Sequence, residues 1–163
     1  MEINYKLLNL LNENARYSDR ELAVMLNMTE KEVKRQIAEM ETAGIIRVYK
    51  AVVDWDRMDH AYVSALIELK VVPQPDSGFE EIARRVMEFD EVETVYLMSG
   101  GYDLCLIVTG KTFQEVAMFV AKRLATMAEV TSTATHFVLR RYKELNVKLC
   151  DDAKGDDRRT MSL

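Results

Sequence analysis

The 163-residue chain lacks the features of secreted proteins, membrane-spanning proteins and proteins stabilised by a bound metal ion. Its two cysteines, Cys105 and Cys150, are too few for a disulfide framework or a cysteine-rich metal site. No apolar run approaches the roughly 20 residues that span a bilayer, and the first residues do not form a secretory signal. We therefore expect a cytoplasmic protein with no membrane partner.

Catalytic motifs are also missing. The chain has no Gly-x-Ser-x-Gly, Walker or HExxH motif. Its two histidines, His60 and His136, are far apart and lack partners at ligand spacing, which favours structural roles. We expect no catalytic residue, no metal site and no cofactor.

The chain carries no excess of positive charge, because its net charge is −5. Residues 1–50 hold eight basic and eight acidic side chains, and residues 51–149 hold 11 and 15. A nucleic-acid-binding domain usually has a basic patch. Any DNA contact must therefore come from a local cluster in the neutral first third.

What the sequence does contain is a globular composition, with 48% hydrophobic and 30% charged residues. Four segments begin with a hydroxyl residue followed three positions later by glutamate, the pattern of a capping box that starts a helix. The four pairs are Ser18…Glu21, Thr29…Glu32, Ser77…Glu80 and Thr112…Glu115. They place four helix starts.

Apolar spacing predicts three helices in the first third, over Asn4–Glu13, Asp19–Leu26 and Glu30–Ala43, with Gly44 as the final stop. Only Asn27 and Met28 separate the second helix from the third. So short a connection forces a steep crossing angle, which is the helix-turn-helix arrangement.

Alternating apolar residues then predict a short strand or wing over Ile45–Val53. The remaining pattern predicts an α+β fold in which a winged helix-turn-helix domain precedes a ferredoxin-like βαββαβ domain. Its predicted elements are the strand Tyr62–Val72, the helix Phe79–Phe89, the strands Val92–Met98 and Asp103–Thr109, the helix Phe113–Met127 and the strand Val130–Leu145. We assign residues 1–50 to DNA binding, 51–60 to a linker, 61–149 to effector binding and oligomerisation, and 150–163 to a flexible tail.

Motifs in both halves carry a family resemblance. They are Leu11–Ser18 with Glu21-Leu22-Ala23, Val33…Ile37…Met40-Glu41…Gly44-Ile45-Ile46, Gly100-Gly101-Tyr102-Asp103, and Thr133-Ala134-Thr135 with Phe137-Val138-Leu139. Their order over residues 4–145 resembles the leucine-responsive regulator and asparagine regulator (Lrp/AsnC) family of transcription factors. One departure is Glu39, which stands where that family commonly has a basic residue.

In a helix-turn-helix, the N-terminal part of the second helix meets base edges and the first helix crosses the phosphate backbone. Arg35 is suited to a guanine or a phosphate, and lysines neutralise phosphates. The DNA-contacting residues we predict are Thr29, Lys31, Lys34 and Arg35, with Arg16 and Arg20 as backbone contacts. The alternative is a solvated helix face. Because Glu30 and Glu39 repel phosphates, binding to double-stranded DNA should require a dimer.

The turn Gly100–Asp103 permits two interpretations. Paired glycines supply the positive φ of a tight hairpin, which explains the two glycines but not Tyr102 and Asp103 after them. The resemblance implies instead that the turn lies at a subunit interface and binds an amino acid or similar effector, whose ammonium group would pair with Asp103. The predicted effector site contains Ser99, Gly100, Gly101, Tyr102, Asp103, Thr133 and Thr135. We also expect a two-fold dimer through residues 61–145, and the resemblance implies further assembly into octamers.

Two other functions remain open. Sirohaem decarboxylases resemble this family in fold, but tetrapyrrole chemistry needs a basic, histidine-bearing pocket, and this half of the chain is acidic. The other alternative is an effector-sensing partner protein whose helix-turn-helix is vestigial.

Overall fold

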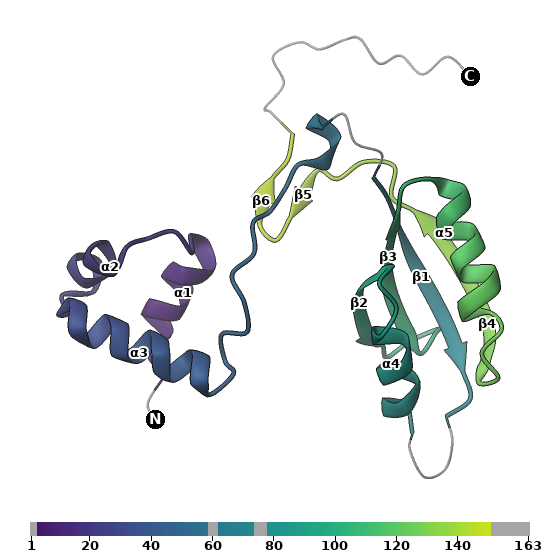
Figure 1. Cartoon of the computed structure of the whole chain (residues 1–163), viewed down its shortest axis with the longest axis horizontal. Helices are drawn as coiled ribbons and strands as arrows, with labels where there is room; N and C mark the ends of the chain where they lie inside the picture. The colour runs from purple at the N-terminus through teal and green to yellow at the C-terminus, as the bar shows by residue number, and fades with distance from the viewer. Residues whose placement is uncertain (1–2, 59–61, 74–77, 151–163) are drawn as a thin grey trace. The chain divides into compact units, whose positions relative to one another are not determined.

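The structure is a computed structural model that describes residues 3–58, 62–73 and 78–150. It contains two compact units, Met1–Ala51 and Val52–Leu163. The first unit consists of helices α1 (Tyr5–Glu13), α2 (Asp19–Leu26) and α3 (Glu30–Thr42) (Figure 1). They enclose a small core of Leu7, Leu11, Leu22, Ala23, Val33 and Met40. The three predicted helices are confirmed.

Side-chain caps fix where these helices begin. The side chain of Asn4 accepts a hydrogen bond from the Leu7 N–H, so it caps α1. Complete capping boxes, Ser18 with Glu21 and Thr29 with Glu32, start α2 and α3. In each box the hydroxyl and the carboxylate satisfy backbone N–H groups that a helix start leaves free.

Residues with left-handed backbone conformation end α2 and α3. Asn27 has φ 53° at the end of α2, and the Met28 N–H donates to the Ala23 carbonyl at 2.9 Å. Asparagine tolerates this conformation better than most residues, so the chain reverses within two residues. Gly44, with φ 68°, ends α3 in the same way. The predicted helix-turn-helix is confirmed.

The strand predicted over Ile45–Val53 is wrong. The structure assigns no strand there, and the next element is the 3-10 turn Trp55–Arg57. The Tyr49 hydroxyl donates to the Glu41 carboxylate on α3 at 2.9 Å, which holds the segment to that helix. A β-branched pattern indicates a strand only where a neighbouring strand offers backbone partners.

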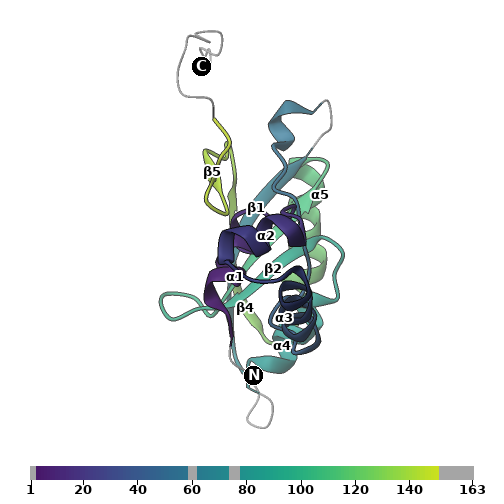
Figure 2. The ribbon, with the colours of Figure 1, turned by 90° about the vertical axis from the view of Figure 1, so that its left-hand side faces the viewer.

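The second unit is built on a four-stranded antiparallel sheet of order β2-β3-β1-β4 (Figures 1 and 2). Its strands are β1 (Val63–Val71), β2 (Val92–Leu97), β3 (Leu104–Gly110) and β4 (Val130–Phe137). Helices α4 (Glu80–Met87) and α5 (Phe113–Phe119) pack on one face over Ile67, Leu69, Leu104, Leu106 and Val108. The ferredoxin-like α+β arrangement is confirmed.

Helix α5 begins at the predicted Phe113 and α4 one residue after the predicted Phe79, but neither start has a complete capping box among the described residues. Ser77 lies outside the described residues, and α4 begins after Phe79, which makes no side-chain cap. At α5, the Thr112 hydroxyl accepts from the Glu115 N–H, but the Glu115 carboxylate accepts from the Lys111 N–H. This second box is therefore half formed. Helix α5 continues into the π-helical turn Val120–Leu124, where the Ala125 N–H donates to the Val120 carbonyl.

The last predicted strand is too long. Strand β4 ends at Phe137, and a separate two-stranded hairpin, β5 (Lys143–Glu144) and β6 (Val147–Lys148), follows it. Leu145 and Asn146 both have positive φ, so the chain reverses where the apolar alternation suggested continuity. The predicted flexible tail lies outside the described residues from position 151 onward, as does His60.

Within the described ranges, no helix is long and apolar enough to cross a membrane. The same residues contain no group of three or more His, Cys, Asp or Glu side chains placed to hold a metal ion.

Candidate functional site

The outer face of α3 presents basic side chains. Lys31, Lys34 and Arg35 are exposed, whereas Val33 and Met40 on the opposite face are buried. This division follows from the 3.6-residue helical period. The three predicted bases therefore share one surface on the helix that should enter a DNA groove.

Two of these bases are held by carboxylates of the same unit. Arg35 Nη1 lies 2.6 Å from Glu39 Oε1, one helical turn away, and Lys34 Nζ lies 3.7 Å from Asp19 Oδ2 on α2. All four side chains are substantially exposed, so each pair contributes little to stability. The pairs orient the two bases, and a phosphate or a guanine must compete with a carboxylate for each.

The Thr29 hydroxyl already caps the start of α3. Its hydroxyl accepts from the Glu32 N–H at 3.2 Å and donates to Glu32 Oε2 at 2.7 Å. The hydrogen bonds from the Thr29 hydroxyl and the Thr29 N–H lower the pKa of Glu32. In the same way, hydrogen bonds from the backbone and hydroxyl of Ser18 lower the pKa of Glu21. Thr29 thus positions α3, and a base contact would need its hydroxyl to reorient.

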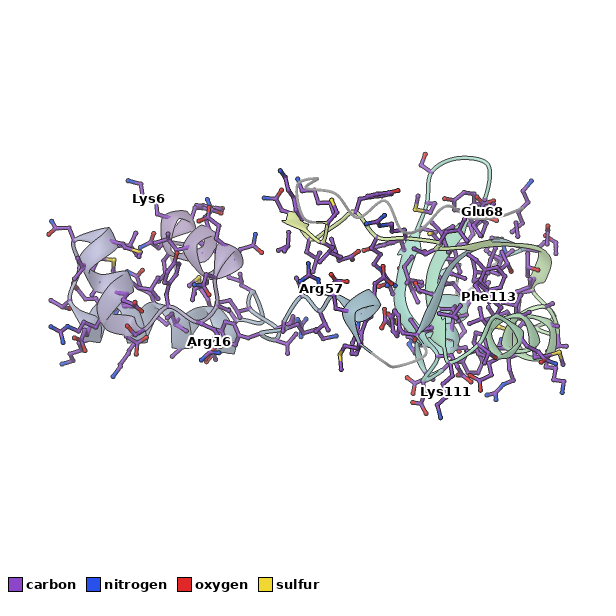
Figure 3. All side chains as sticks on the ribbon, turned by 90° about the horizontal axis from the view of Figure 1, so that it is seen from above. Lys6, Arg16, Arg57, Glu68, Lys111 and Phe113 are labelled. Atoms are coloured by element: carbon purple, nitrogen blue, oxygen red, sulfur yellow. The ribbon has the colours of Figure 1, made fainter. Side chains whose placement is uncertain are left out.

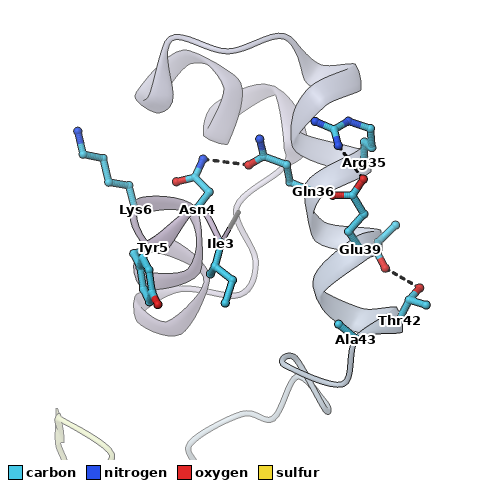
Figure 4. Close-up of a pocket in the computed structure, with 10 residues that line it drawn as sticks. Ile3, Asn4, Tyr5, Lys6, Arg35, Gln36, Glu39, Thr42 and Ala43 are labelled. Carbon is cyan, nitrogen blue, oxygen red and sulfur yellow. Dashed lines mark hydrogen bonds and ion pairs between the residues drawn. The ribbon is translucent and has the colours of Figure 1, made fainter. Parts of the chain in front are cut away.

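The predicted backbone contacts, Arg16 and Arg20, are both exposed. Figure 3 shows Arg16 on the first unit. The Arg16 N–H donates to the Asn14 side chain at 3.0 Å, which fixes the bend between α1 and α2. The structure also shows an open groove of about 1060 Å³ between α1 and α3 (Figure 4). Lys6 and Gln36 line it beside Arg35, and sequence analysis missed both because they belong to no motif.

The turn between β2 and β3 is closed by a hydrogen bond from the Met98 N–H to the Asp103 carbonyl at 2.8 Å. Neither Gly100 nor Gly101 has a φ in the left-handed region, so the hairpin explanation for the two glycines is wrong. A Cβ added at either position would meet no atom within 4 Å. No described residue therefore requires glycine here, and both glycines leave exposed backbone open to approach.

Asp103 has a structural role that the sequence did not reveal. Its Oδ2 accepts the Val71 N–H at 2.8 Å, and its own N–H donates to the Leu69 carbonyl at 2.9 Å. These bonds extend the pairing of β1 with β3 by one rung beyond Leu104. Among the described residues, the second carboxylate oxygen, Oδ1, has no hydrogen-bond partner, so Asp103 retains one oxygen for a ligand.

Tyr102 turns back over the sheet face that the helices leave open. It lies beside Cys105 of β3 and Glu68 of β1. Partial burial raises the pKa of the Tyr102 phenol, and the neighbouring Cys105 and Glu68 raise it further. Burial likewise raises the pKa of the Cys105 thiol, which argues against a reactive thiolate.

Thr133 and Thr135 lie on the other face of the sheet. They pair with Leu69 and Ile67, whose side chains are buried under the helices, and residues directly opposite each other share a face. The open face instead carries His136, whose Nε2 lies 3.3 Å from Glu68 Oε1. Within one copy, the predicted effector residues therefore divide between two faces, and the structure does not gather them into one site.

Comparison with known proteins agrees with both units. The Lrp/AsnC ligand binding domain family matches residues 64–147, and a winged helix-turn-helix DNA-binding family matches residues 2–47. The chain is 42% identical over 139 residues to the HTH-type transcriptional regulator YugG of Bacillus subtilis, which covers 85% of this chain and 84% of YugG.

Solved structures show the same fold. The crystal structure of PH0061 from Pyrococcus horikoshii superposes with a TM-score of 0.76 at 21% identity, covering 88% of this chain and 95% of that one. The transcriptional regulator NMB0573 of Neisseria meningitidis, solved as an L-Met complex, gives 0.71 at 24% identity, covering 88% and 92%. The chain belongs to the Lrp/AsnC family of helix-turn-helix transcriptional regulators.

Proposed function

We propose that this protein recognises specific DNA sequences through α3, assembles through its second unit and responds to an amino acid or a similar small effector. The observation that carries the proposal is the geometry of α2 and α3. Two complete capping boxes and the left-handed Asn27 hold these helices in a helix-turn-helix, and α3 presents Lys31, Lys34 and Arg35 outward.

In this proposal Arg35 leaves Glu39 to contact a guanine or a phosphate, and Lys31 and Lys34 neutralise phosphates. Arg16 and Arg20 contact the backbone from the region of α2. Because residues 1–50 have no net charge, one unit should bind weakly. Two units on adjacent half-sites are therefore needed.

The effector would meet the turn Gly100–Asp103. Open backbone at Gly100 and Gly101 suits the carboxylate of an amino acid, and the unpartnered Oδ1 of Asp103 suits its ammonium group. Ser99 is exposed beside the glycines and would add a hydroxyl. A site that also includes Thr133 and Thr135 would combine the turn of one copy with the β4 strand of another.

Assembly is proposed through the sheet face that the helices leave open, within residues 61–145. Strand alternation places Leu66 and Ile107 on this face with Glu68 and His136, so it mixes apolar and polar side chains. A two-fold dimer would cover it and place two DNA-binding units on one assembly. Octamers would be a further level of the same assembly.

We propose no enzymatic activity and a cytoplasmic site of action, where the DNA target lies. The sirohaem alternative needs a basic, histidine-bearing pocket. Of the two histidines, only His136 lies in the described part of the chain, and it faces a glutamate.

The deciding experiment is selection of bound fragments from genomic DNA, with and without a panel of amino acids. Lys34→Ala/Arg35→Ala should lose the selected operator, whereas Arg84→Ala on α4 should retain it as a matched control. Arg35→Ala alone should weaken binding by about 1–3 kcal/mol if it reads a base. Wild-type affinity in the double variant would refute the role of α3.

An effector that changes DNA affinity must itself bind DNA-bound protein with an affinity changed by the same factor. If no amino acid changes the selected fragments, the melting temperature or the assembly mass, the effector part of the proposal is wrong.

A further inference from the structure

The strongest concentration of positive charge in the second unit is a segment that the proposed function does not use. Residues 138–149, which we call the basic arm, hold four basic side chains and one acidic. Residues 51–137 hold seven basic and 14 acidic side chains. The sign of the charge therefore reverses at the end of β4.

Residues 143–148 of the basic arm form a short β-hairpin. Strands β5 and β6 pair through Lys143 with Lys148 and through Glu144 with Val147, and Leu145 and Asn146 form the two-residue turn. Figure 1 shows this hairpin apart from the four-stranded sheet.

Aromatic side chains anchor the base of the arm. The Arg141 guanidinium lies 4.9 Å from the centre of the Tyr62 ring, which in turn stacks on Trp55 at 5.0 Å. The Tyr62 hydroxyl donates to Glu93 at 3.1 Å, and Arg141 has Glu144 at 3.9 Å. Arg141 therefore serves to fix the arm to its own unit.

Two other bases of the arm point to solvent. Arg140 and Lys143 are exposed, and Arg140 lies 5.0 Å from the centre of the Tyr142 ring. Neither has a carboxylate at ion-pair distance among the residues that the structure describes. This differs from Lys34 and Arg35, both of which are paired.

We propose that the basic arm is a second DNA-binding element, which contacts the phosphate backbone through Arg140 and Lys143. The inference rests on the proposed DNA-binding function. A two-stranded ribbon has the dimensions of a DNA groove, and the exposed cations Lys143, on the hairpin, and Arg140, just before it, suit phosphates. The need for such an element follows from charge, since the first 50 residues are neutral and residues 51–137 would be repelled by DNA.

A second copy of the chain is the competing partner, because Leu139 and Leu145 of the arm are 86% and 80% exposed. The DNA interpretation is favoured by charge, because Arg140 and Lys143 are exposed and have no carboxylate at ion-pair distance among the described residues. Apolar contact through the two leucines would leave both of these cations without a counter-charge.

The test measures how the affinity of the full-length protein for a non-specific DNA duplex depends on salt concentration. Arg140→Gln/Lys143→Gln should reduce the slope of log K against log salt by about 1.8, because each lost phosphate contact contributes about 0.9. The matched control, Lys111→Gln/Lys122→Gln, removes the same charge from exposed positions at and near α5 and should keep the wild-type slope. Arg140→Lys/Lys143→Arg keeps both charges and should also keep it.

An unchanged slope in the arm variant overturns the inference, as does an equal fall in the control, which would indicate a general charge effect. A change of assembly mass in light scattering without a change of slope would assign the arm to a second copy. Loss of operator selection in the Lys34→Ala/Arg35→Ala variant tests the role of α3 and does not test the basic arm. If the wild type binds no DNA, both the inference and the proposed function are wrong.

Discussion

Replacing Asp103 by alanine removes the acceptor of the Val71 N–H, which it holds at 2.8 Å. A buried donor left without a partner costs about 1–3 kcal/mol. Asp103 is only partly buried, so water replaces some of the lost bond, and we expect a loss of about 1–2 kcal/mol. In a unit of this size, 1 kcal/mol lowers the melting temperature by roughly 5 °C, so Asp103→Ala should lower it by about 5–10 °C.

Asp103→Asn is the matched variant, because its amide oxygen still accepts the Val71 N–H while the negative charge is lost. It should unfold within a few degrees of the wild type, yet no longer bind the ammonium group of an effector. Thermal unfolding followed by circular dichroism at one protein concentration, with and without effector, measures both effects. Equal melting temperatures for the alanine variant and the wild type would refute the role of the hydrogen bond. A normal effector response in Asp103→Asn would refute the ammonium contact.

Four further outcomes are expected. Thr29→Ala should destabilise the first unit by about 1 kcal/mol in thermal unfolding, because it removes the cap of α3. Hydrogen bonds from Thr29 hold the pKa of Glu32 below its ordinary 4.5, so their stabilisation is complete above pH 4.5 and is lost as the pH falls through the lower folded value. The stability difference between wild type and Glu32→Gln should therefore shrink in acid. Ile107→Lys on the open sheet face should convert the assembly to monomers in light scattering, and an unchanged mass would exclude this face. Titration with sirohaem should leave its visible spectrum unchanged, whereas a tight complex would support the enzyme alternative.

The sequence was most informative where the determinants of structure are local. The Ser18 and Thr29 capping boxes lie within four residues of the helix starts they control, and Asn27 and Gly44 end helices through their own conformations. Apolar periodicity placed β1 to within one residue at each end. These features need no information about distant parts of the chain.

Predictions failed where the outcome depends on a distant partner. The segment Ile45–Val53 has the alternation of a strand but meets no neighbouring strand in the described chain. The role of Asp103 depends on Val71, 32 positions away. Thr133 and Thr135 were correctly placed on a strand, but register decides which face they occupy. Motif resemblance indicates which residues matter and does not fix their contacts.

The ion pairs of Lys34 and Arg35 also bear on how the protein searches a genome. In the proposed complex with random DNA, a phosphate would replace the carboxylate that each base already contacts, so Asp19 and Glu39 would offset part of the gain from each phosphate contact. A correctly placed guanine would add two directed hydrogen bonds, so Arg35 would gain more by exchanging partners there. Restrained cations on α3 would thus shorten the residence time at wrong sites more than at the operator. Excess genomic DNA then sequesters less of the protein, and discrimination rises without a stronger operator contact.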